Sequence, residues 1–357
     1  MYKITLVPGD GIGPEVTAIA REIVDLLGVP IEWEVVPAGE QAIDLYGTPL
    51  PDILLESIAR NKICLKGPIT TPVGGGYRSI NVTLRQYFHL YANLRPIKLY
   101  PGAPSRCSKV DIIIVRENTE DLYCGIEFQE GREETRELIN FVKEKTGREI
   151  PFDSGISLKP NSIAASERIA RFAFAYAAKN GRKKVTAVHK ANILKYSDGL
   201  FLEACRKVAQ EFPQIAFEDR IVDNMCMQLV QKPELYDVLV LPNLYGDIIS
   251  DLAAGLVGGL GLAAGANIGE EIALFEPVHG SAPKYRGQNK VNPTAMLLAA
   301  NLMLDYLGEK EASERLENGI AEVIKEGRVV TYDLKPGTTE GVVGTREMAE
   351  AIKSKLK

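Results

Sequence analysis

The feature that most constrains the fold of this chain is a regular alternation of short apolar runs with longer amphipathic segments. Strand-like runs occur at residues 2–7, 31–36 and 63–65, and they alternate with segments of helical periodicity such as VTAIAREIVDLLG and PDILLESIARN. Strands that alternate with helices are typical of α/β folds with a largely parallel sheet. We therefore predict an α/β fold.

This alternation is interrupted once along the chain. Residues 124–160 are rich in charge and carry short β-like pieces around one helical stretch, which predicts an arm. Beyond them the alternation returns. We expect strands at 183–190 and 236–243 and helical blocks at 293–326 and 345–356.

Composition allows a large core and excludes several functional classes. With 357 residues, 45% of them hydrophobic, the chain can form two lobes. Its 42 basic residues are interspersed among 47 acidic ones, so we expect no nucleic-acid or membrane surface, and small molecules and another protein chain as partners. No apolar run is long enough to span a membrane, and we expect no secretory leader. The five cysteines are scattered without a Cys-x-x-Cys pair, which favours reduced thiols in a cytoplasmic protein.

The opening stretch GDGIGPE superficially resembles a nucleotide-binding loop. A dinucleotide fingerprint needs the spacing G-x-G-x-x-G, whereas Gly9, Gly11 and Gly13 are spaced G-x-G-x-G and Pro14 follows at once. Proline suits the first turn of a helix, and Asp10 could cap backbone N–H groups. We interpret the stretch as a tight turn from strand to helix rather than a Rossmann fingerprint.

A cluster of polar side chains follows a glycine-rich loop and predicts a site for a polycarboxylate. Arg85 and Arg95 offer bidentate forks that suit carboxylates, and Arg116 at the end of the apolar run VDIIIV adds a third. Ser79 and Asn81 can hydrogen-bond a further acidic group or a hydroxyl. Each arginine alone could be a surface residue, but three near strand ends favour a binding site.

A second cluster is acidic and indicates a metal site. Asp247 and Asp251 are four residues apart, which places them on one helical face next to an expected turn at Gly246. Together with Asp223 they offer hard oxygen ligands that suit Mg²⁺ or Mn²⁺ completed by substrate and water. The alternative is a helix start that carries favourable acidic residues.

Two further side chains could move protons. Tyr123 and Lys190 each follow an apolar strand. A lysine with a lowered pKa can take up a proton near neutrality, and a tyrosine can return one. Each could equally be a structural hydrogen-bonding group.

Several stretches of the chain together indicate a known family. GDGIGPE, YANLRP, VRENTEDLY, VHKAN, NLYGDIISD, FEPVHGSAP and NP occur in this order. This order resembles the β-decarboxylating dehydrogenases, the family of isocitrate, 3-isopropylmalate and homoisocitrate dehydrogenases, and is most similar to the bacterial NADP-dependent isocitrate enzymes. The resemblance extends over nearly the whole chain.

The resemblance implies a two-lobed fold without a Rossmann fingerprint and with a clasp arm. It places the large domain with the cofactor loop at 1–90 and 258–357. The small domain, with substrate, metal and dimer contacts, would comprise 91–120 and 163–257. Residues 121–162 would form the arm that interlocks two subunits.

The resemblance also implies the reaction. RSINVTLRQ is similar to the isocitrate branch, in which the equivalents of Ser79 and Asn81 meet the γ-carboxylate and those of the three arginines hold the rest of the substrate. We therefore expect oxidation of isocitrate to 2-oxoglutarate and CO₂ by a homodimer with shared active sites. The partner subunit would supply Lys190 and Asp223, Mg²⁺ or Mn²⁺ would bind the three aspartates, and Tyr123 would protonate the enolate.

The family holds its dinucleotide in a loop near the end of the chain. By resemblance the cofactor-binding residues are Thr71, His279, Gly280, Ser281, Ala282, Lys284, Tyr285, Val291, Asn292 and Tyr332. Lys284 stands where NAD-dependent members usually carry an acidic residue, so we expect NADP. Pro336 stands where some NADP enzymes carry an arginine, which weakens the expected discrimination against NAD, and Lys290 or Arg286 could compensate.

Two other functions compete with this interpretation. One is an NAD-dependent isocitrate or homoisocitrate dehydrogenase, against which Lys284, Ser79 and Asn81 argue. The other is a non-catalytic regulatory subunit. Such subunits tend to lose catalytic or metal residues, whereas this chain keeps Tyr123 and Lys190, and its three aspartates, so catalysis is favoured.

Overall fold

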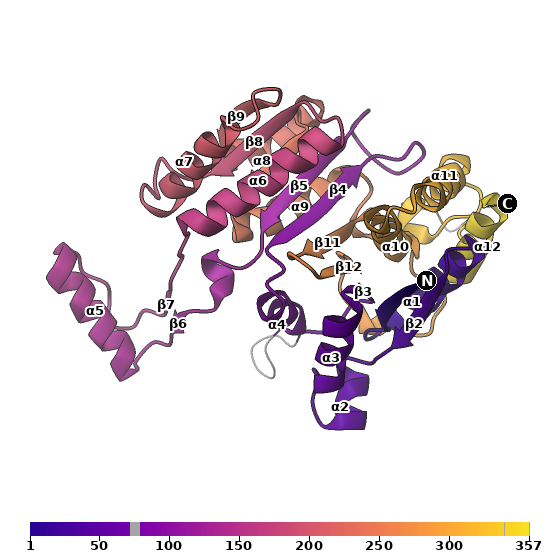
Figure 1. Ribbon diagram of the computed structural model, residues 1–357, viewed down its shortest axis with the longest axis horizontal. Coiled ribbons are helices and arrows are strands. Elements are labelled where there is room, and N and C mark those ends of the chain that lie inside the picture. Colours follow the sequence, from indigo (N-terminus) through magenta and orange to yellow (C-terminus); the bar gives the residue numbers. More distant parts are fainter. Residues whose placement is uncertain (72–78, 339, 357) are drawn as a thin grey trace.

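A mixed sheet of ten strands runs through both lobes of the computed structural model, which describes residues 1–71, 79–338 and 340–356 (Figure 1). Within this described part the strand order is β2-β1-β3-β12-β11-β4-β5-β10-β8-β9. The strands are β1 (Tyr2–Val7), β2 (Ile31–Val35), β3 (Ile63–Lys66), β4 (Ala92–Lys98), β5 (Asp111–Glu117), β8 (Lys184–His189), β9 (Ala216–Ile221), β10 (Val238–Leu241), β11 (Ala264–Ile268) and β12 (Ala273–Pro277).

The sheet consists of two parallel ends and an antiparallel centre. Strands β2, β1, β3 and β12 pair in parallel in one lobe, as β5, β10, β8 and β9 do in the other. The central strands β11 and β4 pair antiparallel with each other and with their outer neighbours. Because β4 and β11 run between the two parallel ends, a pocket over these strands is bounded by both lobes.

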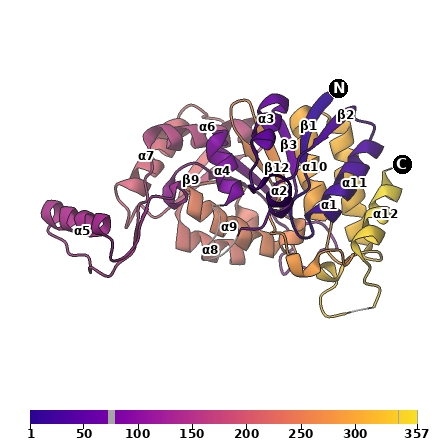
Figure 2. The same ribbon diagram turned by 90° about the horizontal axis from the view of Figure 1, so that it is seen from below.

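Helices cover the sheet in both lobes (Figures 1 and 2). Helix α10 packs against β11 and β12, whereas α6 and α9 pack against β5. The helices of the body are α1 (Gly13–Leu26), α2 (Glu40–Tyr46), α3 (Asp52–Asn61), α4 (Ile80–Tyr87), α6 (Ile163–Lys179), α7 (Ser197–Ala209), α8 (Val222–Gln231), α9 (Asn243–Leu256), α10 (Thr294–Leu307), α11 (Lys310–Glu326) and α12 (Thr345–Lys355).

Local sequence explains why these elements form where they do. All residues of β10, Val-Leu-Val-Leu, are buried, as expected for a parallel strand covered on both faces. Ser162 caps the start of helix α6, because its hydroxyl accepts a hydrogen bond from the Ala165 N–H at 3.1 Å. The predicted helical block at 293–326 is two helices, because Gly308 adopts φ = +84° and ends α10.

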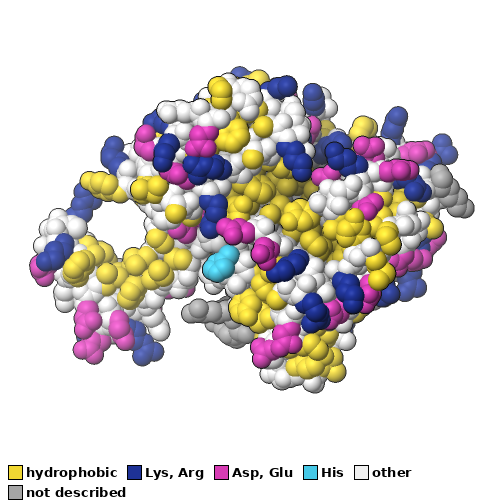
Figure 3. All heavy atoms as spheres, viewed as in Figure 1, with side chains coloured by type: hydrophobic (Ala, Val, Ile, Leu, Met, Phe, Trp, Pro, Cys, Tyr) yellow, Lys and Arg dark blue, Asp and Glu magenta, His cyan; other side chains and the backbone are white. Residues whose placement is uncertain are grey.

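An arm leaves the body next to α6 (Figures 1 and 2). It consists of a two-stranded sheet of β6 (Glu127–Phe128) and β7 (Ile156–Ser157) and of helix α5 (Glu133–Thr146). Hydrophobic side chains gather along it in Figure 3, and Ile126, Phe141 and Phe152 are exposed. The predicted arm is therefore confirmed, and its apolar side chains lack cover within the described part of one chain.

The predicted α/β fold is confirmed. The expected strands at the N-terminus and those at 183–190 and 236–243 coincide with observed strands. Short elements without a strong apolar pattern, such as α4 and α8, were not predicted. No described helix is long and apolar enough to cross a membrane.

Candidate active site

A pocket of about 500 Å³ lies over the central strands of the sheet. The ends of β3, β5 and β12 reach it, as do the first turns of α4 and α9. Many of the residues that the sequence singled out line it: Thr71, Ser79, Asn81, Arg85, Arg95, Arg116, Tyr123, Asp247, His279, Gly280, Ser281 and Ala282. The fold thus brings predicted substrate-binding residues and predicted cofactor-binding residues into one pocket.

The three arginines of the pocket are all buried. Arg116 donates from Nε and Nη2 to Asn243 Oδ1 at 3.0 and 2.7 Å. Its side chain lies against Gly246, where a Cβ would stand 2.5 Å from the Arg116 Cγ. The expected turn at Gly246 is therefore wrong: this glycine is in the first turn of α9, and it makes room for the arginine. Burial and the repulsion of Arg95 lower the pKa of Arg116 to about 10, so it stays cationic at neutral pH.

Asp247 connects these arginines to Tyr123. Its carboxylate forms an ion pair with Arg116, lies 3.4 Å from Arg95 Nη1, and accepts a hydrogen bond from the Tyr123 hydroxyl at 2.5 Å. Burial would raise the pKa of Asp247, but Arg116 and Arg95 outweigh it and the pKa is lowered. Burial and the bond to Asp247 raise the pKa of Tyr123. At neutral pH the pair is therefore a carboxylate beside a protonated phenol.

The three predicted metal ligands, Asp247, Asp251 and Asp223, do not all lie together in one chain. Asp251 lies one helical turn after Asp247 on α9, and burial together with that neighbour raises its pKa, although Arg95 opposes this. Asp223 instead pairs with Lys190 at 2.7 Å, and neither of these two lines the pocket. Among the described residues no group of three or more acidic, cysteine or histidine side chains could hold a metal ion. Of the three predicted metal ligands, only Asp247 lines this pocket, and Asp251 lies beside it, 3.7 Å from Arg95 Nη1.

A buried ion cluster that the sequence did not single out supports the pocket. Glu276, at the end of β12, lies 2.8 Å from Lys66 Nζ and 3.0 Å from Arg85 Nη2. Burial would raise the pKa of Glu276, but Lys66 and Arg85 lower it strongly. Two buried cations thus share one carboxylate, which holds the Arg85 guanidinium in place.

Asparagines extend this cluster to the second arginine. Asn267 donates to Glu276 at 2.8 Å and accepts from Asn93 at 2.7 Å, and Asn93 in turn accepts from Arg95 Nε at 2.9 Å. The orientations of two binding arginines therefore depend on one polar network. A sequence signal existed for Glu276, because it is a charged residue closing an apolar strand, as Arg116 is.

A second pocket of about 380 Å³ adjoins the first through His279, Gly280 and Ala282. The predicted cofactor residues Tyr285, Val291, Asn292 and Tyr332 line it, together with Ile12, Gly261 and Asp333. Burial lowers the pKa of His279, so its imidazole is neutral at pH 7. The two pockets thus lie side by side, the first lined by three arginines and the second mainly by apolar and aromatic residues.

Two lysines lie at the aromatic rim of this second pocket. Lys284 Nζ is 4.8 Å from the Tyr285 ring centre. Lys290 Nζ is 5.0 Å from the same ring and 5.3 Å from the ring of Tyr332. Arg286 points elsewhere and lies 3.6 Å from Glu40. Of the two candidates to compensate for Pro336, the structure places Lys290 beside the tyrosines.

The opening glycine turn packs between two loops of the site. Gly11 has φ = +57°, and a Cβ there would lie 2.1 Å from the Ser281 carbonyl oxygen. Asp10 does not cap its own helix: its carboxylate accepts hydrogen bonds from the backbone N–H groups of Glu40 and Thr70 at 2.8 and 2.9 Å. The turn therefore joins the loop after β3 to the predicted cofactor loop. Asp10 does bind backbone N–H groups, as predicted, but those groups belong to the start of α2 and to the loop after β3.

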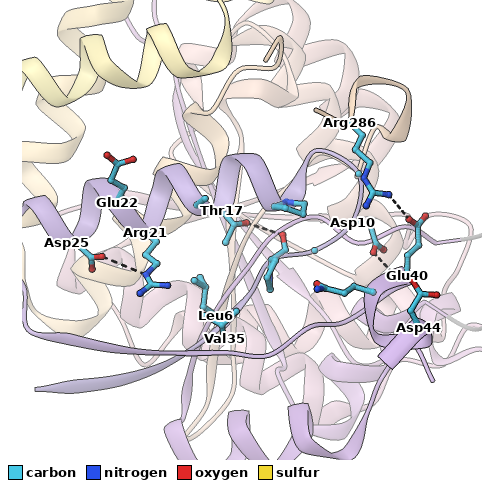
Figure 4. Close-up of a pocket in the computed structure, with 16 residues that line it drawn as sticks. Leu6, Asp10, Thr17, Arg21, Glu22, Asp25, Val35, Glu40, Asp44 and Arg286 are labelled. Atoms are coloured by element: carbon cyan, nitrogen blue, oxygen red, sulfur yellow. Dashed lines mark hydrogen bonds and ion pairs between the residues drawn. The ribbon is translucent and has the colours of Figure 1, made fainter. Parts of the chain in front are cut away.

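Beyond this turn lies the larger hollow shown in Figure 4, of about 630 Å³, between α1, β2 and α2. None of the predicted site residues lines it. Its charged side chains mostly pair with one another at the rim, as Arg286 does with Glu40 and Arg21 with Asp25. The residues predicted to bind the substrate thus lie in the smaller pocket over the central strands.

Known proteins resemble this chain along its whole length. The family model described as isocitrate/isopropylmalate dehydrogenase matches residues 3–352. A protein named isocitrate dehydrogenase [NADP], from Archaeoglobus fulgidus, is 48% identical, covering 98% of this chain and 91% of the relative. The isocitrate dehydrogenase [NAD] catalytic subunit 5, mitochondrial, of Arabidopsis thaliana is 47% identical over 98% of this chain and 87% of the relative. The crystal structure of isocitrate dehydrogenase from Methylococcus capsulatus superposes with a TM-score of 0.91 at 51% identity, covering 100% of this chain and 99% of that chain.

The Glu276 cluster generates a stability prediction. Glu276→Gln would leave Lys66 and Arg85 buried without a counter-charge, so the free energy of unfolding should fall by about 3 kcal/mol or more. Because the native pKa of Glu276 is strongly lowered, its contribution is fully present above the unfolded pKa of about 4.3 and is lost progressively as the pH falls from there toward the folded pKa. Urea unfolding at pH 7 and at about pH 3 measures both effects.

The matched control is Glu271→Gln, since Glu271 pairs with Lys62 at 2.7 Å on the exposed surface. It should change the unfolding midpoint little. Equal midpoints for the two variants would contradict a structural role for the Glu276 charge.

Proposed function

Because the chain belongs to the isocitrate/isopropylmalate dehydrogenase family, we propose that it catalyses the metal-dependent oxidative decarboxylation of isocitrate to 2-oxoglutarate and CO₂ with NADP. The observation that carries this proposal is the pocket that is lined by three buried arginines together with Ser79 and Asn81. Arginine forks bind carboxylates in pairs of hydrogen bonds, so this wall suits a tricarboxylate.

The polar end of the pocket favours isocitrate over an isopropyl-bearing substrate. The Asn81 Oδ1 and the Arg85 Nε are buried and have no hydrogen-bond partner among the described residues. Beside an apolar group both would stay unpaired, whereas a carboxylate can accept a hydrogen bond from the Arg85 Nε and a hydroxyl or water can donate one to the Asn81 Oδ1. We therefore assign the γ-carboxylate to this end.

The residues at the other end fit a divalent cation. Asp247 and Asp251 present hard oxygen donors on one face of α9, and their mutual repulsion is part of what raises the pKa of Asp251. We propose that the partner subunit's Asp223 completes the set. When bound, Mg²⁺ or Mn²⁺ would polarise the C2 oxygen of the substrate and stabilise negative charge there.

The protein side chains would then move the protons. NADP, when bound, would supply the hydride acceptor for C2, and the partner subunit's Lys190 would accept the proton of the C2 hydroxyl. Loss of CO₂ from C3 leaves an enolate, and Tyr123 would return a proton to that carbon. The hydrogen bond from Tyr123 to Asp247 keeps the phenol protonated until that step.

A shared site explains why Lys190 and Asp223 lie outside the pocket of their own chain. In one chain they form a partly exposed ion pair at 2.7 Å. Exposed Ile248 on α9 and Met227 and Val230 on α8 offer an apolar surface near them. We propose a homodimer in which residues 121–162 interlock as a clasp and each chain lends Lys190 and Asp223 to the other.

The cofactor preference rests on the lysines at the rim of the second pocket. Lys284 and Lys290 flank Tyr285 and Tyr332, an arrangement suited to a 2′-phosphate. NAD is the specific alternative, because an NAD-dependent catalytic relative is almost as similar as the NADP-dependent one. A purely regulatory role is disfavoured because the catalytic and metal residues are all present.

The direct test is an assay of the purified chain with Mn²⁺. Isocitrate, homoisocitrate and 3-isopropylmalate are each offered with NADP and with NAD, and the reduced nicotinamide is followed by absorbance. We expect the isocitrate and NADP pair to give the highest kcat/KM. No reduction with any pair would reject catalysis, and a higher kcat/KM with NAD would reject the cofactor assignment.

A complementation experiment tests the shared site. Lys190→Met and Tyr123→Phe should each abolish overall turnover in their own homodimers. Co-expressed, the two chains should recover activity, because a mixed dimer has one site with both side chains intact. If Lys190 acted within its own chain, every site would lack one residue and the mixture would stay inactive.

The substrate assignment predicts the effect of a charge at Ser79. Ser79→Glu should raise the KM for isocitrate by at least about tenfold, because the new carboxylate would face that of the substrate. Steady-state kinetics measures this change. Thr83→Glu, one turn further along α4 and outside the pocket lining, is the control and should leave KM nearly unchanged. An unaltered KM in the Ser79 variant would place Ser79 outside the substrate site.

The cofactor assignment predicts which lysines matter. Lys284→Asp and Lys290→Met should each lower kcat/KM for NADP by about tenfold or more and that for NAD much less, because a charge-assisted bond to the 2′-phosphate is lost. Lys325→Asp on the exposed face of α11 is the control. An equal fall in kcat/KM with NADP and with NAD would show that the lysines do not bind the 2′-phosphate.

A further inference from the structure

A buried ion triad lies at the root of the arm and belongs to neither pocket. Lys159, on the limb that returns to the body, places its Nζ 2.8 Å from Asp198 Oδ1 and 3.2 Å from Asp121 Oδ1. Both carboxylates are completely buried, and the ammonium also lies 5.2 Å from the ring centre of Tyr245. Without the lysine, two buried negative charges would face each other.

The first carboxylate holds the segment that carries Tyr123. Asp121 opens a short 3-10 helix, Asp121–Cys124, in a left-handed conformation with φ = +65°. Its side chain accepts hydrogen bonds from the Leu122 N–H at 2.8 Å and from the Leu244 N–H at 2.9 Å. Leu244 is in the first turn of α9, three residues before Asp247. The Asp121 carboxylate therefore ties the short helix that carries Tyr123 to the first turn of α9, the helix that carries Asp247.

The second carboxylate holds the segment that carries Lys190. Asp198, in the first turn of α7, accepts a hydrogen bond from the Lys190 N–H at 2.7 Å through its other oxygen. The Lys159 ammonium thus binds two carboxylates, of which Asp198 holds the backbone of Lys190 and Asp121 holds the segment of Tyr123. The arm supplies the cation that joins them.

We propose that Lys159 is a positioning residue that sets two active sites at once: the Tyr123 and Asp247 half of its own chain's site, and the Lys190 that its chain lends to the partner. This inference rests on the proposed function, in particular on the shared site. Lys159 does not touch Arg85, Arg95 or Arg116, which bind the substrate. Its loss should therefore lower kcat by a larger factor than it raises the KM for isocitrate, because the substrate-binding arginines are reached only through Asp247.

The first experiment compares homodimers. Lys159→Gln should lower kcat at least about tenfold, because a catalytic group displaced by about 1 Å can lose on the order of 100-fold in rate. Lys159→Arg keeps the cation and should retain most of the activity. Lys143→Gln removes an exposed ion pair with Glu149 on the same arm and is the matched control. Thermal unfolding and size-exclusion chromatography verify that each variant folds and dimerises.

The second experiment uses mixed dimers with differently tagged chains, one of them carrying Lys190→Met. Only one site then works, and it combines Tyr123 of the Lys190→Met chain with Lys190 of the other chain. We expect Lys159→Gln to lower kcat when it is placed in either chain. Asp198→Asn leaves the Lys159 and Asp121 pair intact and should lower kcat only in the chain that supplies Lys190.

The outcomes separate this inference from the proposed function. An inactive wild-type chain would reject the proposed function. An active wild type with unchanged kcat in the Lys159→Gln dimer, or a loss from only one chain of the mixed dimer, would overturn the double positioning role. If Lys159→Gln does not fold, Asp198→Asn tests the part of the proposal that concerns Lys190. An equal fall in kcat whichever chain of the mixed dimer carries Asp198→Asn would contradict that part.

Discussion

The candidate active-site pocket depends on one buried negative charge, that of Glu276. Lys66 and Arg85 both pair with it, and Asn267 and Asn93 relay its hydrogen bonding to Arg95. Cations buried in a protein need such a partner, because removal from water is costly. With the partner fixed at the end of β12, a wall of arginines can stay charged and oriented to receive an anionic ligand.

The same requirement explains the second group of charged residues. Lys159 balances Asp121 and Asp198 at the arm, and those carboxylates in turn hold backbone that carries Tyr123 and Lys190. Polar networks of this kind fix geometry because each member has only one arrangement that satisfies the others. In the proposed dimer the arm therefore contributes to the positions of catalytic groups as well as to the interface.

Much of the fold could be predicted from local pattern. The sequence predicts strand β10 because four apolar residues lie between residues that favour turns. Helix α6 has a serine cap at its start. The central strands β11 and β12 were missed; each is only five residues long, and β11, Ala-Gly-Ala-Asn-Ile, consists mostly of small residues with weak β-propensity. Gly246 was placed in a turn because glycine is common there. Its actual role is to admit the Arg116 side chain to the first turn of α9.

The sequence by itself determined the α/β class, the arm, and the residue types that an anionic substrate, a divalent cation and a dinucleotide need. The tertiary structure decided which of those residues meet. Three arginines separated by up to 31 positions, from Arg85 to Arg116, and an aspartate more than a hundred positions later share one pocket, whereas Lys190 and Asp223 pair outside it. Local periodicity carries no information about such distances, because the side chains meet only when β12, β11, β4 and β5 pair as neighbours in the sheet.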